Sequence, residues 1–398
     1  MRYPRFTALT AIALTSLNLR TAVTALSPLV PEIQRSIGVS ASMVGVLGMI
    51  PTAMFAIAAF VLPGFKRRLT TSQLLLIAML LTAAGQLLRV SAGPVMLLGG
   101  SVAALFAIGV TNALLPLAVR EYFPNHISSM SIGYLISSQI TMALSPILAV
   151  PISVWAERTG LSGWRVSLGS WALLGLLAAM AWIPLLGHRG ENPDVKTPEP
   201  SMGVPVWRTP VGVGLGLMFG FTSFVTYSMM AFLPQMVPDP QLGAALLGWW
   251  SILGLPLNII GPWVVDRVAD SFPFVLLAAV LMIIGNAGLC LAPMTAPWVW
   301  TTLAGLGPLA FPMALTLINI RARTPEGATA LSSFGQGLGY SVACLGPLLT
   351  GITLQLTGGF RAVLAVFVTA TVIVIAGSFF ATRPVFVEDQ ARGRGKGI

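Results

Sequence analysis

Long apolar runs alternate with short polar loops along almost the whole chain. A helix that crosses a bilayer needs about 20 apolar residues, and twelve runs reach that length. Gly and Pro recur inside them, which membrane helices tolerate. The pattern predicts an all-α membrane protein with twelve transmembrane helices, at about residues 7–31, 42–64, 73–92, 94–119, 129–152, 165–187, 210–234, 242–264, 273–292, 297–320, 328–352 and 360–382.

One long polar stretch, residues 188–209, lies near the middle of the chain. It separates two sets of six predicted helices. We therefore expect an N-terminal six-helix bundle at residues 1–187, a cytoplasmic linker at 188–209 and a C-terminal six-helix bundle at 210–383. The remaining residues, 384–398, include the basic run "ARGRGKGI" and are expected to form a solvated cytoplasmic tail that anchors to lipid.

The two halves also resemble each other in sequence. With a constant offset of 201 residues, Arg120 matches Arg321 and Pro146 matches Pro347. Together with the equal helix counts, these matches indicate a duplicated six-helix unit. Two pseudo-symmetric six-helix bundles are the architecture of the major facilitator class, in which the first, fourth, seventh and tenth helices line a site near the midplane. Twelve helices in another arrangement are the alternative.

The composition excludes a soluble protein. Hydrophobic residues make up 56% of the chain and charged residues 9%, and the mean hydropathy is +0.86, whereas soluble domains carry roughly 25% charge. The net charge of +10 comes from short clusters between apolar runs, so no nucleic-acid-binding stripe is expected. Cys290 and Cys344 lie inside apolar runs and predict no metal site or disulfide framework. No cofactor is expected.

The distribution of Lys and Arg predicts the orientation. With the N-terminus inside, sixteen of these residues fall on the cytoplasmic side and five, including Arg89, on the outer side. Basic residues favour the cytoplasmic side. We therefore expect a multi-pass protein of a prokaryotic inner membrane with both termini in the cytoplasm. The first run lacks a small-residue cleavage site, which indicates a retained helix rather than a signal peptide.

Arg20 is the main candidate for function, because it lies in the middle of the first predicted span. A charge there is costly and usually functional. Thr24 and Ser27 share its helix face, while Asn18 points away. A guanidinium donates two parallel hydrogen bonds to a carboxylate, nitro group or small anion. We expect Arg20 to hold such a group in the central cavity; the alternative is a structural Arg bonded to backbone carbonyls.

No Asp, Glu or His lies well inside any predicted span. An unpaired buried charge is expensive, so we expect the substrate itself to be the counter-ion of Arg20. Proton-driven transporters commonly use an intramembrane acid or His. Glu32, near the outer end of the first span, is the nearest candidate, and an interfacial acid in water is its alternative. Uniport, exchange, or co-transport of a proton carried by the substrate fit better.

Other polar residues complete the predicted site. Gln336 and Tyr340 are spaced i, i+4 on the eleventh span and so share a face. Asn112 lies mid-span on the fourth helix and Tyr227 on the seventh. Amides in membrane helices also bridge neighbouring helices, a contribution of about 0.6 kcal/mol each, and this is the alternative for Asn112 and Gln336.

Two stretches resemble the cyanate permease branch of the major facilitator superfamily, which includes 2-nitroimidazole transporters. "LNLRTAVTALSPLVPEI" (17–33) resembles its first helix and "ALSSFGQGLGYSVACLGPLLTG" (330–351) its eleventh. The resemblance implies that Asn18, Arg20, Gln336 and Tyr340 occupy the branch's characteristic positions. It also implies a small anionic or nitro-bearing substrate. The loop "PGFKRRLTTSQ" departs from the wider superfamily, because it lacks the usual Asp.

We therefore predict a secondary transporter, not an enzyme, that works by alternating access as a monomer in the lipid bilayer, without nucleic-acid partners. The predicted substrate-binding residues are Asn18, Arg20, Thr24, Asn112, Tyr227, Gln336 and Tyr340. The alternative is a broad-specificity drug exporter with an apolar pocket, which fits poorly with a lone intramembrane Arg. A membrane enzyme would need a catalytic group in the spans, and a receptor would need a large soluble segment; the sequence indicates neither.

Overall fold

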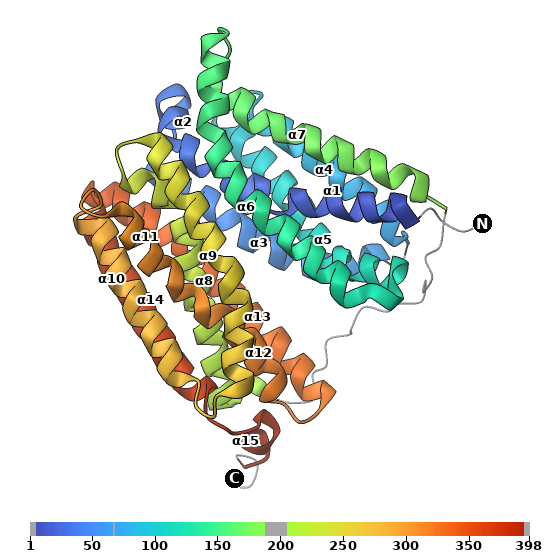
Figure 1. Cartoon of the computed structure of the whole chain (residues 1–398), viewed down its shortest axis with the longest axis vertical. Helices are drawn as coiled ribbons and strands as arrows, with labels where there is room; N and C mark the ends of the chain where they lie inside the picture. Colours follow the sequence, from blue (N-terminus) through green and yellow to red (C-terminus); the bar gives the residue numbers. More distant parts are fainter. Residues whose placement is uncertain (1–4, 67, 188–204, 394–398) are drawn as a thin grey trace. The chain divides into compact units, whose positions relative to one another are not determined.

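The computed structural model describes residues 5–66, 68–187 and 205–393 (Figure 1). Within these ranges the chain is helical and has no strand. Twelve helical segments are long and apolar enough to cross a membrane. This confirms the predicted all-α class and the number of spans. Most of the predicted linker, 188–204, and the end of the predicted tail, 394–398, lie outside the described residues.

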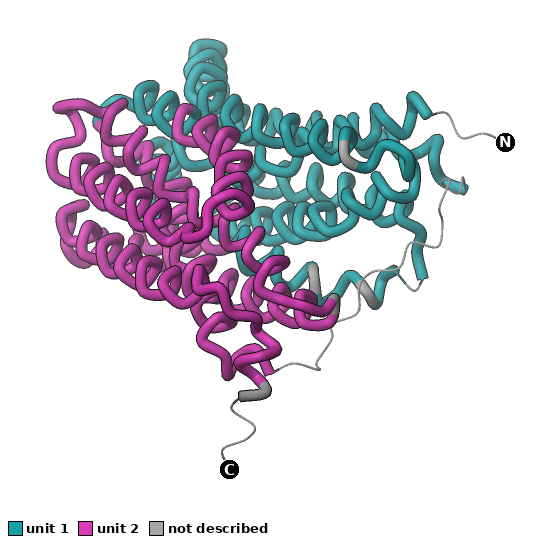
Figure 2. Tube along the Cα trace, turned by 60° about the horizontal axis from the view of Figure 1, so that its bottom comes forward, with its two compact units in different colours: residues 1–40, 50–197, 238–248 teal, residues 41–49, 198–237, 249–398 magenta. Residues whose placement is uncertain are grey.

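The chain divides into two compact units (Figure 2). Unit 1 comprises residues 1–40, 50–197 and 238–248, and unit 2 comprises residues 41–49, 198–237 and 249–398. The first seven helices are α1 (Arg5–Thr24), α2 (Val30–Ile37), α3 (Ala41–Lys66), α4 (Thr71–Arg89), α5 (Pro94–Tyr122), α6 (Ile127–Arg158) and α7 (Gly163–Trp182). The others are α8 (Pro210–Phe232), α9 (Pro240–Arg267), α10 (Phe272–Leu291), α11 (Pro297–Leu306), α12 (Ala310–Ile320), α13 (Pro325–Thr357), α14 (Phe360–Ala381) and α15 (Val387–Gly393).

In unit 1, α1 packs against α5, α6 and α7, and α4 packs against α5 and α7. Large side chains fill this core, including the fully buried Trp164, Trp182 and Tyr122. The indole Nε1 of Trp182 donates a 2.8 Å hydrogen bond to the hydroxyl of Thr15 on α1. A buried indole N–H needs such a partner, so this bond fixes α7 against the helix that carries Arg20.

In unit 2, α8 packs against α12, α13 and α14. Small residues let α8 and α13 approach closely: a Cβ on Gly220 would lie 3.1 Å from the Cα of Gly339. Phe219 of α8 makes an edge-to-face contact with Tyr340 of α13, with ring centroids 5.2 Å apart. Close backbone packing at small residues is the usual basis of helix association in membranes. These two helices therefore form one tightly packed pair.

The predicted internal repeat has a structural counterpart in each unit. In unit 1, a Cβ on Gly85 of α4 would lie 2.5 Å from the amide nitrogen of Ala104 on α5. In unit 2, a Cβ on Gly285 of α10 would collide with the amide nitrogen of Ala304 on α11. The two contacts occupy corresponding helices and both require glycine. The next residue after each glycine has a buried side-chain amide: Gln86 follows Gly85, and Asn286 follows Gly285.

The first span is interrupted, although the sequence pattern predicted one helix over 7–31. α1 ends at Thr24, a 3₁₀ turn follows at Ser27–Leu29, and α2 begins at Val30. Pro28 and Pro31 explain the break, because proline has no N–H to donate to the carbonyl four residues earlier. The tenth span is likewise divided into α11 and α12 by a 3₁₀ turn at Gly307–Leu309.

The fifth and eleventh spans are longer than predicted. α6 extends over Ile127–Arg158 and α13 over Pro325–Thr357, although both are rich in Ser and Gly. Their hydroxyls are satisfied inside the helix: Ser137 donates to the carbonyl of Gly133, and Ser341 to that of Gly337. Such bonds let serine sit in an apolar helix without an unsatisfied polar group.

The C-terminal segment differs from the solvated tail that we expected. Residues Val387–Gly393 form α15, Val387 is fully buried, and Glu388 is 8% exposed. The amide of Val387 donates to the carbonyl of Arg321 at 2.9 Å. Only the second half of 384–398 is basic; its first half carries two Val residues and two acids, and α15 in this part packs against α8 and α13.

Candidate functional site

Arg20 lies on α1, one turn before the helix ends. Its side chain is half-buried, and its Nε is buried with no hydrogen-bond partner among the described residues. In that part of the chain, no hydrogen bond or ion pair to the guanidinium is formed. A buried charge without a partner is costly. The geometry leaves the donors of Arg20 available for a ligand, and it does not support the structural alternative in which they bind backbone carbonyls.

Thr24 is the last residue of α1 and is fully buried. Its hydroxyl contacts the hydroxyl of Ser145 on α6 at 2.6 Å and donates to the carbonyl of Arg20 at 3.1 Å. The side chain is thereby committed to two protein groups. Thr24 links the end of α1 to α6, so its predicted contact with substrate would require one of these bonds to break.

Asn18 lies on another face of α1 and is fully buried. Its Nδ2 donates to the carbonyl of Leu14, 3.0 Å away, and to that of Leu174 on α7, 3.2 Å away. The second bond joins two helices of unit 1. This is the helix-bridging arrangement that the helical pattern favours for a residue pointing away from Arg20.

Asn112 lies in the middle of α5, as predicted from its position in the fourth span. It is half-buried, and its Nδ2 is buried without a partner among the described residues. Asn112 and Arg20 are thus two side chains of unit 1 with unsatisfied buried donors. Among the predicted residues of this unit, Arg20 and Asn112 are the ones with a buried donor that has no partner in the described part of the chain.

The other predicted residues belong to unit 2. Gln336 and Tyr340 lie one turn apart on α13 and are half-buried, and Tyr227 is 9% exposed on α8. Gln336 donates from Nε2 to the hydroxyl of Ser332 at 2.7 Å. The ring of Tyr340 packs on Phe219 of α8. The close α8–α13 pair therefore carries all three residues.

Glu32, the candidate for proton coupling, lies in the first turn of α2. Its carboxylate accepts hydrogen bonds from the Ser153 hydroxyl at 2.6 Å and from the amide of Trp164 at 2.8 Å. Trp164 is in the first turn of α7, where amides lack partners within the helix. Glu32 thus caps α7 and is not the solvated interfacial acid that formed the alternative to coupling.

Arg89 was expected on the outer side, near the end of the predicted span 73–92; it is the last residue of α4 and is 1% exposed. Its Nη1 donates to the carbonyl of Ala22, 3.0 Å away on α1. The positive-inside count assigns each basic residue near the end of a span to one side of the membrane and takes no account of its burial, so it could not detect a buried Arg. Arg89 therefore stabilises the end of α1 close to Arg20.

The loop that lacks the usual Asp is fixed by other residues. Thr71, the first residue of α4, donates to the Glu121 carboxylate at the end of α5, at 2.6 Å. Lys66 at the end of α3 donates to the Thr71 hydroxyl at 2.5 Å. An acid is therefore present at this end of unit 1, but it comes from α5 and not from the loop.

A sequence model of the Major Facilitator Superfamily matches residues 12–344. The chain belongs to this superfamily. Its members are secondary transporters and not enzymes, so the predicted class of protein is confirmed. The predicted branch is also supported, because two relatives carry the names of the compounds that the sequence resemblance implied.

Three relatives are similar over most of their length. The chain is 27% identical to the uncharacterized transporter YycB of Bacillus subtilis over 98% of this chain and 96% of that protein. It is 27% identical to the 2-nitroimidazole transporter of Escherichia coli, with 87% and 88% covered. It is 26% identical to the cyanate transport protein CynX of Escherichia coli, with 88% and 91% covered.

Solved structures share the fold. A crystal structure of a D-xylose–proton symporter superposes with a TM-score of 0.71 at 15% identity, covering 96% of this chain and 98% of that chain. A mutant of the nucleoside transporter NupG gives 0.74 at 13% identity, covering 96% and 100%. A bacterial homologue of the lysosomal transporter Spinster gives 0.70 at 15% identity, covering 98% and 97%.

Proposed function

We propose that this chain moves a small anionic or nitro-bearing solute across the membrane by alternating access, with Arg20 as the cation that binds it. The observation that carries the proposal is the state of Arg20. It is a half-buried guanidinium on a membrane helix, its buried Nε has no partner, and no ion pair satisfies it among the described residues. A ligand with oxygen acceptors would complete its hydrogen bonds.

The position of the acids supports this role. In the described helices that span the membrane, the carboxylates lie near helix ends, at Glu32, Glu121, Glu157, Asp266 and Glu326. None of them is an ion-pair partner for Arg20. Because removing a charge from water is costly unless it is paired, a bound anion would be stabilised by Arg20 more than a neutral or cationic solute would.

The relatives support the chemical class of substrate. Cyanate is a linear anion, and 2-nitroimidazole carries a nitro group, and both present acceptor atoms that a guanidinium can bind. The relatives named for these compounds are 26% and 27% identical to this chain. Asn112 of unit 1 offers a further unsatisfied donor, Nδ2. Thr24, Tyr227, Gln336 and Tyr340 remain predicted members of the binding set, whereas Asn18, which donates to the Leu174 carbonyl, is proposed as a helix-bridging residue.

The test is the thermal stability of the purified protein with cyanate, 2-nitroimidazole or a hydrophobic cation, for wild type and Arg20→Ala. A ligand that binds the folded state raises the melting temperature by mass action. We expect cyanate or 2-nitroimidazole to stabilise the wild type and not Arg20→Ala. Arg20→Lys keeps the charge but lacks the planar fork, so it should retain part of the shift.

The matched control is Arg35→Ala, which removes an exposed Arg from α2 in the same unit. It should keep the ligand-induced shift of the wild type. Equal shifts in wild type and Arg20→Ala would remove Arg20 from the binding site. Stabilisation by hydrophobic cations alone would favour the drug exporter.

The proposal includes an orientation with both termini in the cytoplasm and a monomeric protein. The excess of Lys and Arg on one side supports the orientation. Single cysteines at Arg361 and Asp270, in a background without Cys290 and Cys344, would test it with a membrane-impermeant thiol reagent on intact cells. Arg361→Cys should react and Asp270→Cys should not; the reverse pattern would invert the topology.

A further inference from the structure

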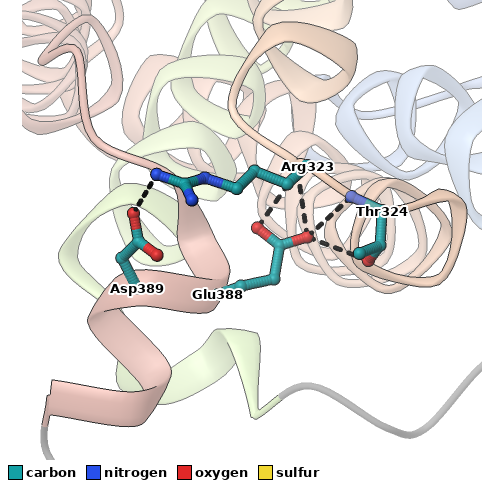
Figure 3. A network of polar contacts seen from close by, with 4 residues as sticks. All are labelled: Arg323, Thr324, Glu388 and Asp389. Carbon is teal, nitrogen blue, oxygen red and sulfur yellow. Dashed lines mark hydrogen bonds and ion pairs between the residues drawn. The ribbon is translucent and has the colours of Figure 1, made fainter.

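The start of α13 is capped by a residue more than sixty positions away in the chain (Figure 3). Both carboxylate oxygens of Glu388 accept from the amide of Arg323, at 3.0 and 3.2 Å, and Oε1 also accepts from the amide of Thr324 at 3.1 Å. The Thr324 hydroxyl donates to the same oxygen at 3.0 Å. A helix N-terminus has unpaired amides and a partial positive charge, so a carboxylate there is stabilising.

The space for this carboxylate exists because residue 327 is glycine. A Cβ at Gly327, in the first turn of α13, would overlap the Oε1 of Glu388. The amide of Gly327 donates to the Thr324 hydroxyl at 3.0 Å, which completes the cap. Glu388 therefore occupies the place that a side chain on α13 would take.

α15, the short helix that carries Glu388, also contacts the start of α8. The amide of Val211 donates to the Oε1 of Gln390 at 3.1 Å. Val211 is fully buried and lies in the first turn of α8, where its amide has no acceptor within the helix. α15 thus supplies acceptors to two helix starts: the Glu388 carboxylate to the residues that precede α13, and the Gln390 side-chain oxygen to the first turn of α8.

Asp389, between these two residues, has a different environment. It forms an ion pair with Arg323 at 2.9 Å (Figure 3). The Arg323 side chain is 58% exposed and that of Asp389 45%. Exposed ion pairs contribute little to stability. Asp389 is therefore an acidic residue of α15 that contacts Arg323 but caps neither α8 nor α13.

We propose that Glu388 and Gln390 are positioning residues: α15 holds the N-terminal ends of α8 and α13 at a fixed separation. The importance of this separation rests on the proposed function, because these two helices carry Tyr227, Gln336 and Tyr340. Phe219 and Tyr340 already join the helices further along. With the ends also joined, α8 and α13 move as one rigid pair, and the three polar groups keep their spacing.

The experiment measures distances within unit 2 by electron paramagnetic resonance, using the full chain in lipid nanodiscs. One spin-label pair replaces Val213 on α8 and Glu326 on α13, both exposed and near α15. A remote pair replaces Met294 and Leu356, which are 55% and 80% exposed. Both pairs are made in a background without Cys290 and Cys344.

We expect Glu388→Gln to broaden the distance distribution of the near pair and to leave the remote pair unchanged. Gln390→Ala removes only the bond to α8 and should also broaden the near pair; it keeps the test valid if Glu388→Gln does not fold. Asp389→Asn is the matched control and should change neither pair.

Unchanged near-pair distributions in the variants would overturn the proposal. Broadening of both pairs would also overturn it, since α15 would then stabilise unit 2 in general without positioning α8 and α13. The measurement needs no substrate. If the proposed anion binding is wrong, the ligands will not raise the melting temperature of the wild type. The spin-label distances do not depend on that result.

Discussion

The Nη1 of Arg89 lies 3.0 Å from the carbonyl oxygen of Ala22 and donates a hydrogen bond to it. Ala22 is in the last turn of α1, where the helix is interrupted and carbonyl groups lose their usual donors. A cation at a helix C-terminus also interacts favourably with the helix dipole. A buried Arg of α4 therefore stabilises the break that follows Arg20.

Arg89→Met should lower the melting temperature. The substitution leaves the Ala22 carbonyl without a donor in a buried site, which costs about 1–3 kcal/mol. Thermal unfolding of the purified protein measures the effect, and Arg361→Met, at an exposed position, is the control. An Arg89→Met variant as stable as the wild type would show that the bond contributes nothing to folding.

Glu388 predicts a pH dependence of stability. Burial acts to raise the pKa of this carboxyl, but hydrogen bonds from the amides of Glu388, Arg323 and Thr324 and from the Thr324 hydroxyl outweigh it and hold the pKa below the ordinary value of 4.5. The charged groups beside it are Asp389 and Arg323. Because the pKa is lowered in the folded state, the carboxylate contributes stability above about pH 4.5 and loses it as the pH falls through the lowered pKa.

Wild type should therefore melt at a higher temperature than Glu388→Gln at pH 7, and the difference should persist at pH 6 and shrink below about pH 4.5. Melting curves of both proteins over this range provide the measurement. A difference that stays constant down to pH 3.5 would mean that the carboxylate charge is not what stabilises the cap.

The contact between α4 and α5 predicts that Gly85 cannot be replaced. A Cβ at this position would lie 2.5 Å from the Ala104 amide and 2.8 Å from the Gly100 carbonyl. Gly85→Ala should thus destabilise the protein by about 1–3 kcal/mol through overpacking.

Gly99→Ala on α5 is the control for Gly85→Ala, because a Cβ at Gly99 meets no atom within 4 Å. Alanine is the better helix former by about 1 kcal/mol, so Gly99→Ala should be neutral or stabilising. Denaturation in detergent distinguishes the two variants. Equal stabilities would argue that α4 and α5 can separate at no cost.

Asn18 and Arg20 should give different mutant phenotypes. Asn18→Ala removes the bond to the Leu174 carbonyl and so should lower the melting temperature, at a cost of about 0.6 kcal/mol for a typical interhelical bond in a membrane. The shift caused by cyanate or 2-nitroimidazole should remain. Titration of each ligand against both variants checks this; loss of ligand binding in Asn18→Ala would place its amide in the substrate site.

The sequence pattern predicted the spans and made Arg20 a candidate because both depend on local composition. A run of apolar residues must be solvated by lipid or protein wherever it lies, and a charge inside one stands out. The break after Thr24 was also readable, since Pro28 and Pro31 follow within seven residues. It was missed because the hydropathy of the run continues through it.

Contacts between distant residues could not be predicted in this way. Arg89 is like the other basic residues that end apolar runs, and its burial depends on the end of α1, 67 positions away. α15 could not be predicted for the same reason, because a polar helix of seven residues shows no clear pattern in the sequence. Thr209 and Thr324 are the N-caps of α8 and α13, each followed by a proline, but nothing local showed that Gln390 and Glu388 would supply further acceptors there.

The capping of α8 by Gln390 also bears on how the protein is made. The ribosome incorporates Val211 179 residues before Gln390, at roughly 5–20 residues per second. Until the last stretch emerges, the amides of Val211, Arg323 and Thr324 lack their acceptors on α15. Unit 2 therefore completes its fold only after α15 has been synthesised, and a premature stop codon just before Val387 should yield an inserted chain whose second half remains open to quality-control proteases.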